Sequence, residues 1–106
     1  MFFIGFHPHN SNAEYKLWKY NSLDSEYCSY NSSNKTITIL KDFNAYIRYE
    51  WLGGSNASLE INGEKVTPVN QKLNLIEREL KVGDIIKHIR TNSTDNYNAL
   101  IGIVAR

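Results

Sequence analysis

Several features are scarce or missing in this 106-residue sequence. It has one cysteine and two prolines, and it has no apolar run near the about 18 residues that a transmembrane helix needs. The single Cys28 excludes an intrachain disulfide and a multi-cysteine metal site. Twelve basic residues against eleven acidic ones give a net charge of +1. Nucleic acid and anionic membranes are therefore not expected as partners, because both attract strongly basic surfaces.

The start of the chain also lacks a secretory pattern. Its apolar stretch at 1–6 has no basic residue before it and is followed by His7-Pro8-His9, which differs from a signal peptide. With the lone thiol, this predicts synthesis in a cytoplasm. Cys28 has no neighbouring His, Lys or Arg that would lower its pKa, so we expect an unreactive side chain.

A catalytic constellation is missing as well. There is no Gly-x-Ser-x-Gly motif, and Gly53–Asn56 lies between two predicted strands as a plain loop. The carboxylate pairs Asp24/Glu26 and Glu77/Glu79 occur in polar segments, where solvated surface charges are expected. We therefore predict that the protein is not an enzyme and needs no cofactor.

The pattern that dominates the sequence is a period of two. Residues 43–52 alternate between an apolar face and a more polar one, which predicts a half-buried strand. Residues 57–66 predict a hairpin with a type I′ turn at Asn62-Gly63. Further strands are predicted at 14–20, 35–40, 85–90 and 98–106.

The segment 70–84 has both strand and helix spacing. We predict a strand that ends in a tight turn at Val82-Gly83-Asp84, and the alternative is a short helical turn around Glu77–Leu80. Together, these elements predict one all-β domain over 1–106. Its fold is an antiparallel β-sandwich, either a jelly roll or immunoglobulin-like.

The aromatic residues suggest one kind of site. Trp18 and Trp51 are expected to fill the core. Tyr27, Tyr30 and Tyr97 are flanked by Ser and Asn and are the surface candidates, because tyrosine suits both protein interfaces and sugar stacking.

The His-Pro-His stretch suggests a second kind of site, one for a metal ion. His7 and His9 share one face of a predicted strand, and Pro8 places them at a sheet edge or a strand end. Two imidazoles cannot complete a metal shell within one chain. Three copies around a threefold axis would supply six, so an axial metal ion is expected only in a trimer.

The second half of the chain resembles the small β-sandwich domains of bacteriophage structural proteins. The resemblance lies in the strand at 44–55, the turn Ile61-Asn62-Gly63, and the step formed by Leu80, Gly83, Asp84 and Ile86. The same step occurs in jelly-roll domains of the C1q/TNF type.

This resemblance implies a non-enzymatic virion subunit, a capsid decoration or tail-associated protein, made in the host cytoplasm. Its partners would be other virion proteins or further copies of itself, as in a trimer. One alternative is a module that binds carbohydrates or receptors, including cell-surface glycans. A further alternative is a small inhibitor of a host protein.

Overall fold

The computed structural model describes residues 2–9, 14–21, 26–31, 33–34, 36–53, 57–68, 70–90 and 97–106, with the backbone alone for 2–9, 14–21, 52–53, 90 and 97–98. These residues form ten β-strands. They are β1 (Phe2–His9), β2 (Glu14–Asn21), β3 (Cys28–Asn31), β4 (Thr36–Ile39), β5 (Phe43–Gly53), β6 (Ala57–Ile61), β7 (Glu64–Lys65), β8 (Leu73–Leu80), β9 (Ile85–Arg90) and β10 (Tyr97–Ala105).

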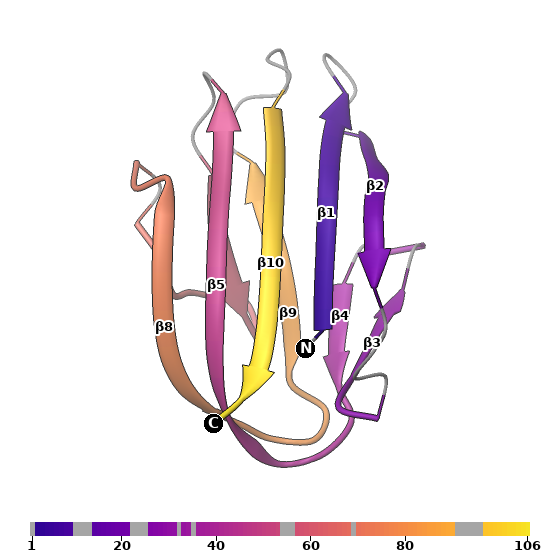
Figure 1. The fold of residues 1–106 in the computed structure, drawn as a ribbon, viewed down its shortest axis with the longest axis vertical. Coiled ribbons are helices and arrows are strands. Elements are labelled where there is room, and N and C mark those ends of the chain that lie inside the picture. The colour runs from indigo at the N-terminus through magenta and orange to yellow at the C-terminus, as the bar shows by residue number, and fades with distance from the viewer. Residues whose placement is uncertain are drawn as a thin grey trace.

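The strands form two five-stranded sheets that lie face to face (Figure 1). The front sheet has the strand order β2-β1-β10-β5-β8, and the back sheet has the order β3-β4-β9-β6-β7. All pairings between described strands are antiparallel. The predicted all-β antiparallel sandwich is thus confirmed.

The pairing is nested along the chain. β1 pairs with β10, β4 with β9, β5 with β8, and β6 with β7, so that each pair encloses the next. A long hairpin that rolls up into two sheets gives this pattern, which defines a jelly roll. β2 and β3 each add an outer strand to one sheet. The nesting decides for the jelly roll over the immunoglobulin-like alternative.

β5 shows how the sequence positions the core. Successive strand side chains point to opposite faces. Ala45, Ile47 and Tyr49 are accordingly fully buried, while Tyr46 and Arg48 between them are exposed. The predicted alternation is confirmed, and so is the burial of Trp51.

The core lies between the two sheets and is rich in isoleucine. Each fully buried isoleucine contributes about 1.5–3 kcal/mol relative to its exposed state. The buried members of the core are Cys28, Ile37, Ile39, Ala45, Ile47, Tyr49, Trp51, Ala57, Leu59, Ile61, Leu80, Ile86, Ala99, Ile101 and Ile103.

A buried hydrogen bond joins the two sheets through this core. The Tyr49 hydroxyl on β5 lies 2.6 Å from Nδ1 of His88 on β9, and both side chains are buried. Burying a hydroxyl or an imidazole without a partner costs free energy, which this bond offsets. It also fixes how the front sheet lies over the back sheet.

The turns carry the backbone conformations that their residues favour. Asn62 and Gly63 have φ angles of 55° and 81°, as a type I′ turn requires, so the predicted hairpin is confirmed. Gly83 has a φ of 90° in the turn between β8 and β9, where a β-carbon would be strained.

A hydrogen-bond network links these two turns. Asn62 Nδ2 donates to Asp84 Oδ1 over 2.9 Å, and the backbone N–H of Ile85 donates to Asn62 Oδ1. The backbone N–H of Lys81 donates to the other Asp84 oxygen. The hydrogen bonds from the Lys81 backbone and from Asn62 lower the pKa of the Asp84 carboxyl below its ordinary value.

The strand and tight turn predicted in 70–84 are confirmed, since β8 runs from Leu73 to Leu80 and a turn leads into β9. The alternative of a short helical turn around Glu77–Leu80 is not found, because β8 continues as a strand through Leu80. Leu73 and Ile76 suggested helix spacing, but an odd spacing places them on opposite faces of a strand. The described residues contain no helix long and apolar enough to cross a membrane.

One prediction concerns the core. Replacing Ile47 with alanine would remove three carbons from a fully buried side chain, so the free energy of unfolding should fall by about 2–5 kcal/mol. Denaturant unfolding, followed by tryptophan fluorescence, measures this loss. The control Val82→Ala, at an exposed position in the β8–β9 turn, should stay within about 0.5 kcal/mol of the wild type. Equal effects for both variants would contradict the placement of Ile47.

A second prediction concerns pH. Because the folded pKa of Asp84 is lowered from an ordinary value of 3.8, its stabilising effect is fully present above pH 3.8. It is lost as the pH falls through the lower folded pKa. The stability difference between the wild type and Asp84→Asn should therefore shrink as the pH falls from 5 toward 2, roughly the range over which such a carboxyl titrates. Urea unfolding across this range measures it. A difference independent of pH would contradict the network.

Candidate functional site

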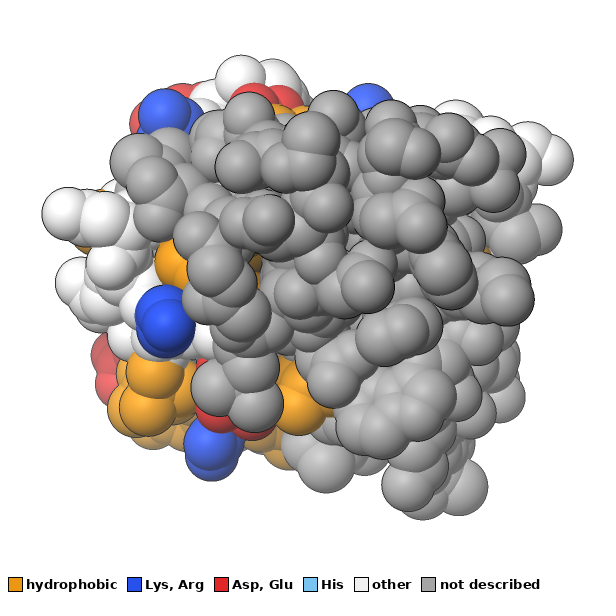
Figure 2. All heavy atoms as spheres, turned by 90° about the horizontal axis from the view of Figure 1, so that it is seen from above, with side chains coloured by type: hydrophobic (Ala, Val, Ile, Leu, Met, Phe, Trp, Pro, Cys, Tyr) orange, Lys and Arg blue, Asp and Glu red, His pale blue; other side chains and the backbone are white. Residues whose placement is uncertain are grey.

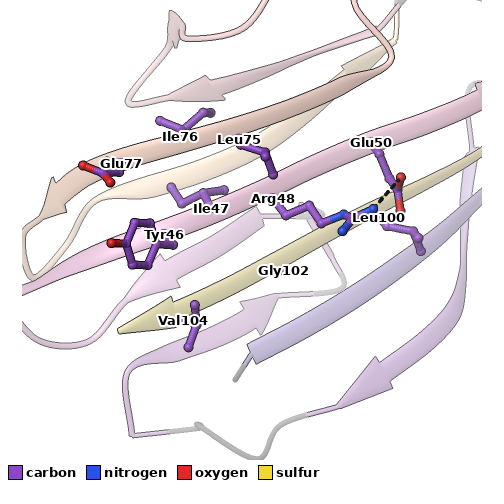
Figure 3. Close-up of a pocket in the computed structure, with 10 residues that line it drawn as sticks. All are labelled: Tyr46, Ile47, Arg48, Glu50, Leu75, Ile76, Glu77, Leu100, Gly102 and Val104. Atoms are coloured by element: carbon purple, nitrogen blue, oxygen red, sulfur yellow. Dashed lines mark hydrogen bonds and ion pairs between the residues drawn. The ribbon is translucent and has the colours of Figure 1, made fainter. Parts of the chain in front are cut away.

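The outer face of the front sheet has an apolar hollow of about 730 Å³ (Figure 3). It lies across β8, β5 and β10, away from the core. Its lining residues are Tyr46, Ile47, Arg48, Glu50, Leu75, Ile76, Glu77, Leu100, Gly102 and Val104.

A position without a side chain, Gly102, lines the hollow together with apolar side chains. Gly102 lies in the middle of β10, with Leu100 and Val104 on either side of it along the strand. The register places Gly102 beside Arg48 on β5, and Arg48 beside Leu75 on β8. A glycine inside a strand often marks a place where another molecule or backbone approaches closely.

The apolar side chains of this face are exposed to an unusual degree. Leu75 has 74% of its surface exposed, while Leu73 and Tyr46 each have 45% and Val104 has 40%. Scattered single apolar residues are normal on a surface, but a contiguous group marks an interaction site. Seen from above, orange side chains gather with blue and red ones along one margin of the described surface (Figure 2).

Ion pairs lie at both ends of the hollow. Arg48 Nη2 is 3.4 Å from Glu50 Oε2, and Arg106 Nη1 is 3.7 Å from Glu77 Oε2. The Arg106 guanidinium also lies over the Tyr46 ring, 5.4 Å from its centroid. The hollow therefore has both signs of charge beside its apolar side chains.

The chemistry of the lining is that of a binding surface. None of the ten lining residues is a serine, cysteine or histidine that would act as a nucleophile with its base. Among the described side chains, no three His, Cys, Asp or Glu residues form a group that would hold a metal ion.

The outer face of the back sheet is different. In its described part, alternation places Thr38, Glu60 and Lys87 outward, where Lys87 is exposed and the other two are half-buried. Two half-buried isoleucines at 85 and 89 are the apolar exceptions. Of the two outer faces, the front one has the larger exposed leucine and valine content.

Two of the predicted tyrosines, Tyr27 and Tyr30, do not line the hollow. Tyr27 and Tyr30 are half-buried and pack against the core. Tyr27 has its ring centroid 4.8 Å from that of Phe43, and Lys41 Nζ lies 4.5 Å above it. Tyr97 begins β10, but its side chain lies outside the described residues. A binding role for these tyrosines stays a prediction.

The histidine pair lies at the end of a strand. The backbones of His7 and His9 belong to β1, where they pair with Lys16 and Glu14 of β2. The pairing of β1 with β10 covers positions 2–6, so Pro8 follows the segment that has neighbours on both sides. Both imidazoles lie outside the described residues, and the axial metal ion stays a prediction.

Cys28 is buried in the core, and desolvation raises the pKa of its thiol to about 11. The unreactive thiol expected from the sequence agrees with this setting.

Sequence reasoning missed the hollow, although its signal is present. The segment 99–104 is apolar on both faces, since Leu100 and Val104 alternate with Ala99, Ile101 and Ile103. A strand of a two-layer sandwich needs only one apolar face. The second apolar face indicates that a further surface is to be covered.

Comparison with known proteins identifies the fold. No protein-family model matches the sequence, and no curated protein is similar to it in sequence. The structure of rabbit GITRL is similar, with a TM-score of 0.63, 18% identity, and coverage of 100% of this chain and 94% of that one. GITRL from bushbaby has a TM-score of 0.63 at 15% identity, covering 99% of this chain and 95% of that one. Eiger TNF from S. frugiperda has a TM-score of 0.63 at 12% identity, covering 99% of this chain and 92% of that one. The chain thus has the jelly-roll fold of TNF-like proteins.

The prediction of a phage structural protein is wrong. The similar solved structures are TNF-family ligands, and no relative in sequence supports a phage role or virion partners. The resemblance depended on Ile61-Asn62-Gly63 and on the step from Leu80 to Ile86. Both are turns that any jelly roll of this size needs, and they say nothing of the partner.

A prediction follows for Cys28. At pH 8, iodoacetamide should label the folded protein far more slowly than the protein in denaturant, because the thiol is buried and its pKa is about 11. Mass spectrometry over time measures the two rates. Similar rates in the folded and unfolded protein would show that Cys28 is not in the core.

Proposed function

We propose that this chain is a non-enzymatic protein-binding module that works as a homo-oligomer. It assembles by burying the outer face of its front sheet against another copy. The observation that carries the proposal is the apolar hollow around Gly102, with Leu75 exposed to 74% beside it.

Leaving the apolar side chains of this face in water costs free energy. Removing apolar surface from water contributes about 25 cal/mol per Å². The outward leucines and valine add nothing to the core, since they lie on the opposite side of the sheet from Ile47 and Ile101. Their burial against a partner is the physical reason for their presence.

A second copy fits this face in size and in charge. The molecule has principal extents of 36 × 24 × 20 Å, so its broad face is large enough for the about 800 Å² that each partner of a specific interface buries. The charges on and beside this face are paired as Arg48 with Glu50, Arg106 with Glu77 and Lys81 with Glu79. A surface with equal numbers of both charges can pair with its own copy without net repulsion.

A non-enzymatic role agrees with the chemistry of the hollow and with the fold. The lining offers apolar side chains and paired charges, without a nucleophile. The fold is shared with GITRL and Eiger TNF, which are ligands of the TNF family.

We predict that sedimentation velocity at about 10 µM will give a mass at least twice the 12.2 kDa of one chain. Leu75→Arg should reduce it to 12.2 kDa, because the substitution places an unpaired charge in the buried interface. Leu75 is mostly exposed in the single chain, so the fold of the variant should stay intact, as checked by its circular dichroism.

The matched control is Leu40→Arg, at an exposed leucine between β4 and β5 that does not line the hollow. It should keep the wild-type mass. A wild type that is monomeric at this concentration, or an oligomer that both variants leave intact, would contradict the proposed function.

A further inference from the structure

We propose that His7, His9 and Glu14 of one chain form a binding site for a divalent transition-metal ion at the end of the β1–β2 hairpin. The strand pairing carries this inference, because it brings Glu14 beside the histidine pair. The site belongs to a single chain and is independent of the proposed self-association.

The register of the two strands brings the three residues together. His9 on β1 lies opposite Glu14 on β2, in an antiparallel pair. Residues directly opposite each other share one face of the sheet, with β-carbons about 4.5–5.5 Å apart. His7 and His9 are two positions apart along β1, so they share this face as well. The diagonal from His7 to Glu14 is about 7–8 Å, which long side chains can span.

The three residues lie on the outer face of the front sheet. Phe6 is opposite Ala99, which is buried in the core, so Phe6 is on the inner face. Successive strand residues alternate between the faces, which places His7 and His9 on the outer one. The register shift in this hairpin falls between Gly5 and Phe6, and the pairing from His7 to His9 is regular. Binding of an ion therefore does not require the sandwich to open.

The histidines lie in a part of the sheet that suits a ligand site. β1 pairs with β10 over positions 2–6, and the segment 7–9 pairs with β2 alone among the described strands. In Figure 1 the arrowhead of β1 and the start of β2 lie side by side at one end of the sandwich. Pro8 between the histidines has no N–H to donate, and its ring fixes φ, so the backbone between them is stiff. A stiff backbone lowers the entropy lost when both histidines bind one ion.

The combination of residue types is one that zinc binds. Zinc prefers four ligands in a tetrahedron, and two histidines, one glutamate and a water molecule are a known set. Two histidines alone fall short of this number. Glu14 is therefore the residue that completes a site within one chain, and only the strand pairing brings it there.

A positive charge shares the same face. Lys16 lies opposite His7 and is two positions from Glu14 along β2. An ion pair between Lys16 and Glu14 is the alternative to metal binding. Ion pairs at a surface are weak in water. A metal ion that binds the carboxylate together with two imidazoles is the stronger partner of Glu14.

The test is a zinc titration of the tag-free protein by calorimetry, in a buffer that does not bind metals, and we expect one ion per chain. His7→Ala, His9→Ala and Glu14→Gln should each weaken zinc binding by at least about 10-fold, since losing even a hydrogen-bond partner of a metal ligand costs about 10- to 100-fold. Zinc should also raise the melting temperature of the wild type more than that of each variant. Circular dichroism checks the fold. Should a histidine variant prove unfolded, the near-isosteric Glu14→Gln decides.

The matched control is Lys16→Ala, on the same face of the same hairpin. It removes the cation that competes for Glu14, so its zinc affinity should equal or exceed that of the wild type. A loss as large as that of Glu14→Gln would overturn the site, and so would an unchanged affinity in Glu14→Gln. One zinc ion per three chains, lost in Leu75→Arg, would also overturn it in favour of an axial ion between copies. One ion per chain in Leu75→Arg supports the site, whatever the outcome for self-association.

Discussion

The pairing of β10 with β5 is the contact on which the rest of the structure depends, and β10 is apolar on both faces. Inward, Ile47 and Tyr49 of β5 and Ile101 of β10 build the core against the back sheet. Outward, β10 places Leu100 and Val104 at the hollow. In a two-layer sandwich one face of each sheet is normally solvated. A strand with two apolar faces therefore suits two interfaces, of which the fold supplies one.

The nested pairing explains why this pair is central. β10 is the last strand, yet it lies between β1 and β5, so the chain closes on itself only after every other strand has been placed. Pairing between segments so distant in sequence costs loop-closure entropy before it gains contacts. Its gain comes from the core and from the Tyr49–His88 bond between the sheets. The turns at Asn62-Gly63 and Gly83 reduce the cost locally, because their residues favour the required φ angles.

The sequence allowed the strands and their turns to be predicted, since both depend on local physics. Period-two alternation in 43–52 and the Asn62-Gly63 turn need no knowledge of partners. A short helical turn at Glu77–Leu80 stayed open as an alternative to the strand, because Leu73, Ile76 and Leu80 have helix spacing while Leu73 and Leu75 also alternate. Pairing with β5 decides for the strand. The strand order also depends on which distant segments meet, so the sequence left the jelly roll undecided. The predicted phage role was wrong because the motifs on which it depended are turns of the chain. Turns carry no information about which partner the protein binds.

The hollow is formed by three strands that are distant in the sequence, so no single strand predicts it. Leu75, Arg48 and Gly102 lie far apart in the sequence and form one row only because β8, β5 and β10 are adjacent. A glycine in a strand usually weakens it, since it loses the most backbone entropy and packs nothing. Because Leu75 and Gly102 lie on the outer face and contribute little to the core, this face can change in evolution without loss of the fold. That independence is compatible with a jelly roll that is retained at 12–18% identity while its outer faces diverge.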